Sequence, residues 1–258
     1  MMHAYCVADK GIMRDHNEDA VIVDEAAGLF AVADGMGGHG MGDVASSLCL
    51  KVLERELADV MESEENPVAE LADDDATLCE TPEPMVEAVR RAVECANAEI
   101  FTLNKARGMS RGRGMGATLA GFKMFDDHSR SVVFHVGDSR VYRYRGGCLV
   151  RLTRDHSVFE EWKREGGHGK APFKNYILRA VGPNPSVNPE ISIQAVLPGD
   201  VWLACSDGLT GMVSDEEIEG VIRNVRRESL PEAADALVEL AKRGGGRDNI
   251  GIVIAASL

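Results

Sequence analysis

The chain has 258 residues, enough for one large domain or two small ones with a substantial core. A hydrophobic content of 45% and a charged content of 27% are those of an ordinary globular protein, and the formal charge of −14 argues against a general affinity for nucleic acid or anionic membranes. The acidic excess is concentrated between Asp59 and Glu83, which hold ten acidic residues and no Lys or Arg, so the remainder carries only −4.

Cysteine spacing and the N-terminal segment both favour a cytoplasmic location. The six cysteines form no C-x-x-C pair or other metal-ligand spacing, and most lie in apolar runs, where a free thiol behaves as a small hydrophobic group. We therefore expect buried, reduced thiols. The segment MMHAYCVADK lacks the basic region and apolar core of a signal peptide, and no apolar run reaches membrane-spanning length. The sequence predicts a soluble, cytoplasmic protein.

An early β-hairpin is predicted from two apolar strands, Ala20–Asp24 and Leu29–Ala33, with a turn between them. Folding the hairpin about its turn places Glu18 and Asp19 beside Asp34, at one end of the sheet. Three carboxylates so close together would repel one another strongly unless a cation lay among them.

The glycine-rich stretch Phe30–Ser46 admits two interpretations, a phosphate site or a metal site. Asp34 ends an apolar strand, and glycines lead from it into a predicted helix. Three of these glycines match G-x-G-x-x-G, the dinucleotide-binding fingerprint, which also requires a second strand with an acid about 20 residues later. Glu54 and Glu56 instead fall within the predicted helix. We therefore favour the metal site.

The other predicted elements give an α+β protein. An acidic, proline-containing insertion is expected at 61–84, and an irregular, basic segment at 155–181. Hairpin-connected strands with helices in separate groups, and no linker, predict one domain over 1–258, with two mostly antiparallel sheets flanked by helices. Helices are predicted at 43–60, 85–104, 215–226 and 231–243, and further strands at 5–8, 116–124, 131–136, 141–145, 148–153, 191–196, 200–205 and 250–255.

Four aspartates are predicted to share one rim of the core. Asp34, Asp138 and Asp207 each follow an apolar strand, whereas Asp248 precedes the last one. If that last strand runs antiparallel to the others, all four lie at the same edge, next to Glu18. A single aspartate at a strand end is usually a turn former, but four at equivalent ends are hard to explain in that way.

Oxygen ligands without His or Cys favour a hard divalent cation, Mg²⁺ or Mn²⁺. So many carboxylates exceed the need of one Mg²⁺ and suggest two ions, which can activate a bridging water for in-line attack on phosphorus. Arg14 is placed to bind a phosphate bidentately at the same rim. These residues together predict phosphomonoester hydrolysis.

The acidic motifs resemble, in order, those of the PPM/PP2C family of metal-dependent protein phosphatases, from about Tyr5 to Ala255. The form Asp-Gly-Met-Gly-Gly-His is similar to the bacterial branch. The resemblance implies an α-β-β-α sandwich with a dinuclear Mn/Mg site at the sheet edge. The motifs are Arg14-x-x-Asn17-Glu18-Asp19, Ala33-Asp34-Gly35-Met36-Gly37-Gly38-His39, Gly137-Asp138-Ser139-Arg140, Ser206-Asp207-Gly208 and Arg247-Asp248-Asn249.

The resemblance also implies metal ligands. Asp34 would bridge the two ions, and the Gly35 carbonyl would bind one of them. Asp207 and Asp248 would hold one ion, and Glu18 would support the other. Asp138, together with Asp207, would help to hold a weaker third ion.

Substrate contacts are implied in the same way. Arg14 would bind the substrate phosphate, Asp19 would orient a metal-bound water, and the segment 155–181 would be the variable flap that shapes substrate choice. Animal members have a His after Asp-Gly that resembles a general acid. Met36 stands there in this chain, which leaves His39 as the nearest substitute or as a histidine of the glycine loop alone. The other six histidines are expected to have no role in catalysis.

The predicted function is hydrolysis of phosphoserine and phosphothreonine in proteins by a monomer that opposes a bacterial Ser/Thr kinase, as the resemblance implies. The alternative is a pseudophosphatase that binds phosphoproteins without turnover. That alternative needs a missing metal ligand, and none is missing from the motifs. A cation-binding module without enzymatic activity would leave Arg14 and the flap without a purpose.

Overall fold

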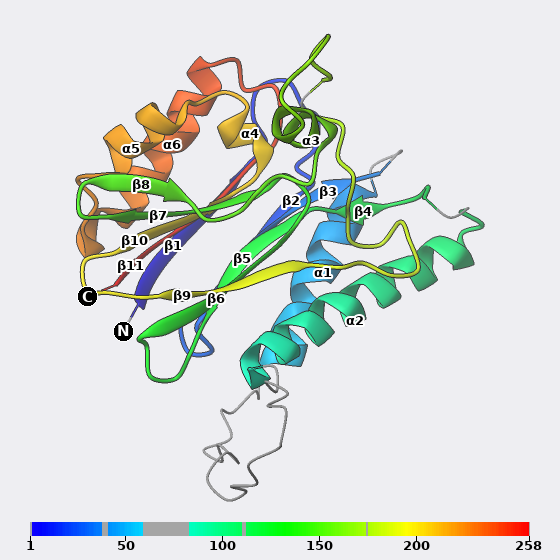
Figure 1. Ribbon diagram of the computed structural model, residues 1–258, viewed down its shortest axis with the longest axis horizontal. Helices are drawn as coiled ribbons and strands as arrows, with labels where there is room; N and C mark the ends of the chain where they lie inside the picture. Colours follow the sequence, from blue (N-terminus) through cyan, green and yellow to red (C-terminus); the bar gives the residue numbers. More distant parts are fainter. Residues whose placement is uncertain (1, 38–40, 59–82, 110–111, 174, 258) are drawn as a thin grey trace, which may run out of the picture.

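The computed structural model describes residues 2–37, 41–58, 83–109, 112–173 and 175–257, and these form an α-β-β-α sandwich (Figure 1). Every strand pair in the two sheets is antiparallel. In spatial order, the first sheet contains β1 (Met2–Asp9), β11 (Ile250–Ser257), β10 (Val201–Cys205), β7 (Arg140–Arg145) and β8 (Cys148–Arg151). The second contains β2 (Asp19–Asp24), β3 (Leu29–Met36), β5 (Leu119–Met124), β6 (Arg130–Val136) and β9 (Glu190–Ala195), and the short β4 (Gly116–Ala117) also pairs with β3.

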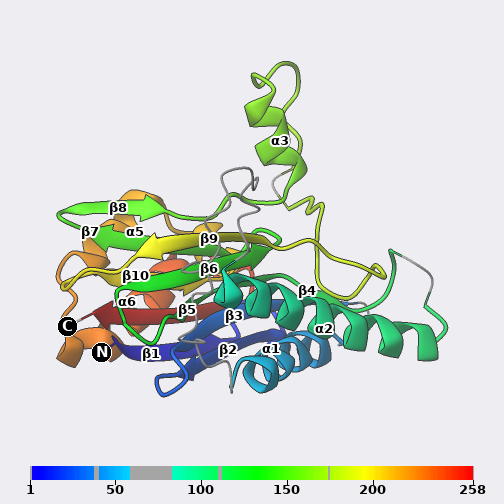
Figure 2. The same ribbon diagram turned by 60° about the horizontal axis from the view of Figure 1, so that its bottom comes forward.

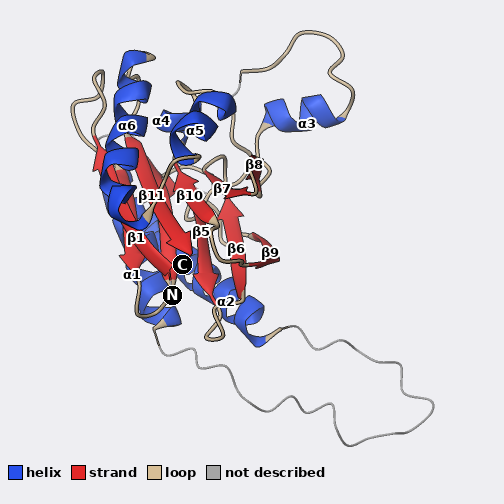
Figure 3. Cartoon of the chain, turned by 90° about the vertical axis from the view of Figure 1, so that its left-hand side faces the viewer, coloured by secondary structure: helices blue, strands red, loops and turns tan. Residues whose placement is uncertain are grey.

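Helices cover the outer face of each sheet (Figure 3). On the second sheet lie α1 (Gly42–Leu57) and α2 (Pro84–Ala106), and on the first lie α5 (Asp215–Ile222) and α6 (Leu230–Arg243), with the short α4 (Asp207–Thr210) following β10. The remaining described α-helix, α3 (Val158–Arg164), buries none of its residues and projects away from the sandwich (Figure 2).

The period-two pattern of the strands produces this layering, because successive side chains point to opposite faces of a sheet. In β3, Leu29, Ala31 and Ala33 pack against the α1 and α2 layer, while Phe30 and Val32 enter the space between the sheets. Since both faces are covered, the strand reads as a continuous apolar run rather than as an alternating one.

Three aromatic rings fill the space between the sheets. Phe30 stacks on Phe122 with 5.0 Å between ring centroids, and Phe122 lies 5.2 Å from Trp202 of the opposite sheet. All three side chains are fully buried. This aromatic contact therefore fixes how the two sheets sit against each other, and with them the rim at which their acidic residues meet.

Most predicted elements are confirmed, and three differ in an informative way. β3 does not stop at Asp34 but continues through Gly35 and Met36, because β4 supplies a pairing partner for them. The segment 155–181 is not wholly irregular, since Ser157 accepts a hydrogen bond from the Glu160 N–H and caps α3. The strands β9 and β10 follow each other along the chain but belong to different sheets.

Some predictions concern residues outside the described part of the chain, and the expected burial of one cysteine is wrong. Val60, most of the acidic insertion (residues 61–82) and His39 lie outside the described part of the chain. Among the described cysteines, Cys49 and Cys205 are buried as expected, but Cys148 is exposed on β8. None of the helices that the structure describes is both long and apolar enough to cross a bilayer.

Replacing Phe122 by Ala should lower the free energy of unfolding by about 3–5 kcal/mol, because the cavity would lie between two sheets that cannot collapse onto it. The matched control is Phe173→Ala, whose ring is 70% exposed and whose loss should cost at most about 0.5 kcal/mol. Denaturant unfolding of the two variants gives the comparison. Equal stability of the two would contradict the role given to the aromatic contact.

Candidate metal centre

Strand pairing brings the predicted aspartates to one rim. In the β2–β3 register Asp19 lies directly opposite Asp34. Asp207 follows β10 and Asp248 precedes β11, and these two strands are antiparallel neighbours. The charges of Asp19, Asp138, Asp207 and Asp248 all act on Asp34. The prediction that the strand-terminal acids share one edge is therefore confirmed.

Crowding and restricted hydration raise the pKa values of these carboxyl groups. Burial raises the pKa of Asp19 to about 7, and the nearby Asp207 and Asp248 charges add to the effect. Burial also raises the pKa of Asp138 to about 7, with contributions from Asp207 and Asp155. Burial, followed by the repulsion of its acidic neighbours, places the pKa of Asp34 well above its ordinary value. The rim strongly resists carrying all its negative charge without a counter-ion.

Two carboxylate oxygens in this cluster have no hydrogen-bond partner among the described residues. They are Oδ1 of Asp19 and Oδ1 of Asp207, and both atoms are buried. An unpartnered buried oxygen is costly unless something binds it. Oxygen donors with this crowding fit a hard divalent cation, so the residues present fit the metal that the motifs imply.

Glu18 is held beside the cluster by backbone and side-chain hydrogen bonds. The Gly42 N–H donates to Glu18 Oε1 at 3.0 Å, and the Glu18 carbonyl accepts from Ser46 Oγ at 2.6 Å and from the Gly35 N–H at 3.1 Å. A Cβ atom on Gly35 would lie 2.1 Å from the Gly42 carbonyl oxygen. Glycine is therefore required at Gly35 for close approach of the two backbones.

Arg14 lies at the exposed edge of the cluster. Its Nη2 donates to Asp248 Oδ2 at 2.7 Å, and about half of its side chain is exposed. Asp248, followed by Asp34 and Glu18, raises the pKa of Arg14 against the opposing effect of its partial burial. The guanidinium therefore stands where an anion approaching from solvent would meet it.

Two further motif residues, to which the sequence patterns assign no role, hold the cluster in place. Ser206 donates to Asp19 Oδ2 at 2.7 Å and accepts from the Gly251 N–H at 2.9 Å, which fixes the Asp19 carboxylate. Asn249 accepts from the Glu18 N–H, and its amide donates to the carbonyls of Lys10 and His16, each at 2.9 Å. Each of these polar residues is adjacent in sequence to a predicted metal ligand, and that position was the clue to its role.

Asp138 is carried by a tight turn after β6. Gly137 adopts a φ of 103°, which glycine alone reaches easily, and its N–H donates to His156 Nδ1 at 3.1 Å. Beyond Asp138, the Ser139 hydroxyl bonds that of Thr118 at 2.6 Å. These contacts hold the Asp138 backbone in place from both sides.

Comparisons with known proteins agree on one family. Residues 10–241 match the model described as "Protein phosphatase 2C". The chain is 34% identical to the serine/threonine phosphatase stp of Listeria monocytogenes over 98% of this chain and 95% of that protein. It is similar to the crystal structure of the Mycobacterium tuberculosis serine/threonine phosphatase PstP/Ppp, with a TM-score of 0.82, 31% identity, and coverage of 99% and 98% of the two chains. The structure of the PstP catalytic domain with two manganese ions gives a TM-score of 0.77, 32% identity, and coverage of 99% and 97%.

The metal-free protein should lose stability as the pH rises from about 4 to 7. Over this range the folded state, in which the pKa values of Asp19 and Asp138 are about 7, binds more protons than the unfolded state. The free energy of unfolding therefore falls as the pH rises, by about 1.4 kcal/mol for each unit by which a pKa is raised. An Asp34→Asn variant removes one mutually repelling acid, and its unfolding free energy should fall less with pH. Denaturant unfolding with a chelator at pH 5 and pH 8 measures the difference between the two proteins.

The control is Asp126→Asn, a change of the same type at an exposed residue. It should follow the wild-type dependence on pH. If the wild-type and Asp34→Asn proteins showed parallel dependence, the repulsion assigned to the cluster would be wrong.

Proposed function

The chain belongs to the protein phosphatase 2C family, and on that premise we propose that the carboxylate cluster at the sheet rim is the catalytic centre of a metal-dependent serine/threonine protein phosphatase. The phosphatase activity follows from the family and from the names of the relatives. The observation that supports this location is the convergence of aspartates around buried oxygens of Asp19 and Asp207 that lack hydrogen-bond partners among the described residues.

We propose two divalent ions held by Asp34, the Gly35 carbonyl, Asp207, Asp248 and Glu18, with Asp138 and Asp207 supporting a weaker third. The ions would supply Lewis-acid chemistry, lowering the pKa of water and neutralising phosphoryl charge. Both Mn²⁺ and Mg²⁺ suit these oxygen ligands. Manganese has the support of the related PstP structure that contains two manganese ions.

The chain's own residues would bind the substrate and orient the attack. Arg14, held at the rim by Asp248, would bind the substrate phosphate through its guanidinium. Asp19, with Oδ2 fixed by Ser206 and Oδ1 unpartnered among the described residues, would orient the attacking water in line with the leaving group. The assignment of His39 as the general acid stays a prediction, because His39 lies outside the described residues.

Substrates are phosphoproteins, and we propose that a cognate Ser/Thr kinase supplies them. Several relatives that support the phosphatase activity are bacterial proteins named as serine/threonine phosphatases. We further propose that residues 1–258 act as a single catalytic domain and a monomer. The pseudophosphatase alternative is not favoured, because every motif position expected to supply a metal ligand holds a residue that can supply one.

Turnover of p-nitrophenyl phosphate and of a phosphothreonine peptide should require added Mn²⁺ or Mg²⁺. Asp207→Asn should lower kcat/KM by at least about tenfold to 100-fold, since loss of a direct ligand should cost no less than the loss of a residue that orients one. Asp126→Asn, at an exposed position, is the matched control and should retain activity. A folded protein that binds Mn²⁺ and turns over neither substrate would overturn the enzymatic assignment.

Arg14→Ala should raise KM for the phosphopeptide on the order of tenfold to 100-fold, because it removes a charge-assisted contact to phosphate. Arg223→Ala removes the same charge from an exposed helix end and should leave KM unchanged. Steady-state kinetics with saturating Mn²⁺ separates the two. Equal KM values for the Arg14→Ala and Arg223→Ala proteins would exclude Arg14 from phosphate binding.

A further inference from the structure

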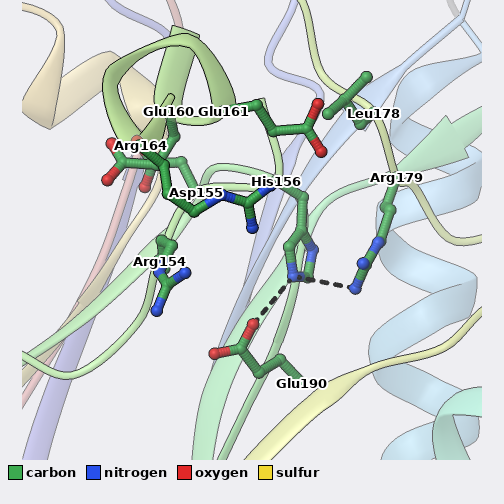
Figure 4. Close-up of a pocket in the computed structure, with 9 residues that line it drawn as sticks. All are labelled: Arg154, Asp155, His156, Glu160, Glu161, Arg164, Leu178, Arg179 and Glu190. Carbon is green, nitrogen blue, oxygen red and sulfur yellow. Dashed lines mark hydrogen bonds and ion pairs between the residues drawn. The ribbon is translucent and has the colours of Figure 1, made fainter. Parts of the chain in front are cut away.

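A pocket of about 260 Å³ is lined in part by residues of α3, and none of the cluster's acids is among its lining residues. Figure 4 shows Arg154, Arg164 and Arg179 among the lining residues, with dashed lines joining His156 to Glu190 and to Arg179. We propose that this pocket binds an anionic side chain of the protein substrate, either a carboxylate or a second phosphate, located close in sequence to the residue being dephosphorylated. The proposal rests on the phosphatase function and adds a specificity subsite to it.

The His156 ring presents a hydrogen-bond donor to the pocket. Its Nδ1 accepts from the Gly137 N–H at 3.1 Å, and its own backbone N–H donates to the Gly137 carbonyl at 2.8 Å. An imidazole that accepts at Nδ1 carries its proton at Nε2. Burial, together with the neighbouring His135 and Arg179, lowers the pKa of His156 to about 4. The neutral ring is thus fixed with Nε2–H toward Glu190 and Arg179.

Two donors face each other at this point. Arg179 Nη1 lies 3.3 Å from His156 Nε2, and neither nitrogen can accept from the other. Glu190 Oε2, at 3.4 Å, accepts from His156, but 52% of the Glu190 side chain is exposed. An acceptor with several oxygens would satisfy His156 and Arg179 together.

The lining of the pocket holds three arginines and four acids, and two of those acids are neutralised by arginines outside the lining. Arg154, Arg164 and Arg179 line the pocket and form no ion pair with any residue that the structure describes. Asp155 pairs with Arg140 at 2.7 Å, and Glu160 pairs with Arg151 at 3.5 Å. The charges of Glu161 and Glu190 remain, so the three arginines leave the lining with a net positive charge. Guanidinium groups without an ion pair therefore favour an anion here.

The same place superficially resembles a metal site, because His135, His156 and Glu190 offer ligand atoms within 4.8 Å of one another. The ring geometry excludes it. The two imidazoles stack with 4.5 Å between centroids and 19° between planes, whereas an ion bound by both must lie close to both ring planes. His135 Nε2 is also engaged by the Arg154 carbonyl at 2.6 Å. Arg179 would further repel a cation.

The position suits a residue that flanks the phosphorylated one. His156 holds Gly137, whose neighbour Asp138 belongs to the carboxylate cluster, and the Asp155 charge reaches Asp138. An extended peptide advances about 3.3 Å per residue, so a side chain a few residues away can enter the pocket. Of the basic residues in the flap, Arg164 and Arg179 are the ones proposed to bind the anion. His156 would donate a hydrogen bond to it and would take no part in catalysis.

The test uses phosphothreonine peptides in which each flanking alanine is replaced in turn by glutamate or phosphoserine. With Mn²⁺-loaded wild type, one or two positions should raise kcat/KM about tenfold over alanine, as expected for one new charge-assisted contact. The glutamate and phosphoserine arms distinguish the two sources of the anion. In the Arg164→Gln/Arg179→Gln double variant, the ratio of kcat/KM with the acidic residue to kcat/KM with alanine should fall toward one. Arg223→Gln, at the exposed end of α5, should keep the wild-type preference.

A second measurement uses the wild type alone, so that it does not depend on folding of the variants. Dephosphorylated product peptides should inhibit about tenfold more tightly when they carry glutamate at the favoured position. No preference at any position, or an equal preference in the double variant, would overturn the subsite. Failure of the phosphatase assignment would look different, because metal-dependent turnover of p-nitrophenyl phosphate would then be absent from the wild type.

Discussion

Mutual repulsion among buried carboxylates governs the energetics of this fold. Asp19 and Asp138 are buried, as are the atoms Asp19 Oδ1 and Asp207 Oδ1. The negative charges of four neighbouring aspartates act on Asp34. Such a group is destabilising when every member is ionised, and divalent cations reverse the sign of that interaction. The fold therefore carries a local cost, which the divalent ions proposed for this cluster would offset.

The two sheets resist that repulsion through connections that do not depend on charge. The aromatic contact of Phe122 with Phe30 and Trp202 fixes the separation of the sheets. Ser206 and Asn249 then join the rim of one sheet to that of the other by hydrogen bonds to Asp19 and to the Glu18 backbone. Because Asp19, Asp248 and the Glu18 backbone are each held by hydrogen bonds, these parts of the cluster cannot simply spread apart.

Positive charge is arranged around this acidic centre at two places. Arg14 stands at the rim beside Asp248, where a phosphate would enter. Arg164 and Arg179 line a pocket with His156, which binds the Gly137 turn, and the proposed subsite there would hold a flanking anion. A substrate with two anionic groups would thus meet two separate contacts, so that chemistry and sequence preference fall to different parts of the surface.

Local sequence patterns were sufficient to predict most strands, the antiparallel hairpin that pairs Asp19 with Asp34, and the shared rim of the four strand-terminal aspartates. These follow from local patterns, since apolar runs with acids at their ends have few ways to pair. Only the tertiary structure decided that β9 and β10 belong to different sheets, that β3 continues to Met36 against β4, and that Arg164 and Arg179 converge on His156. Those features depend on contacts between segments distant in sequence, which no local periodicity encodes.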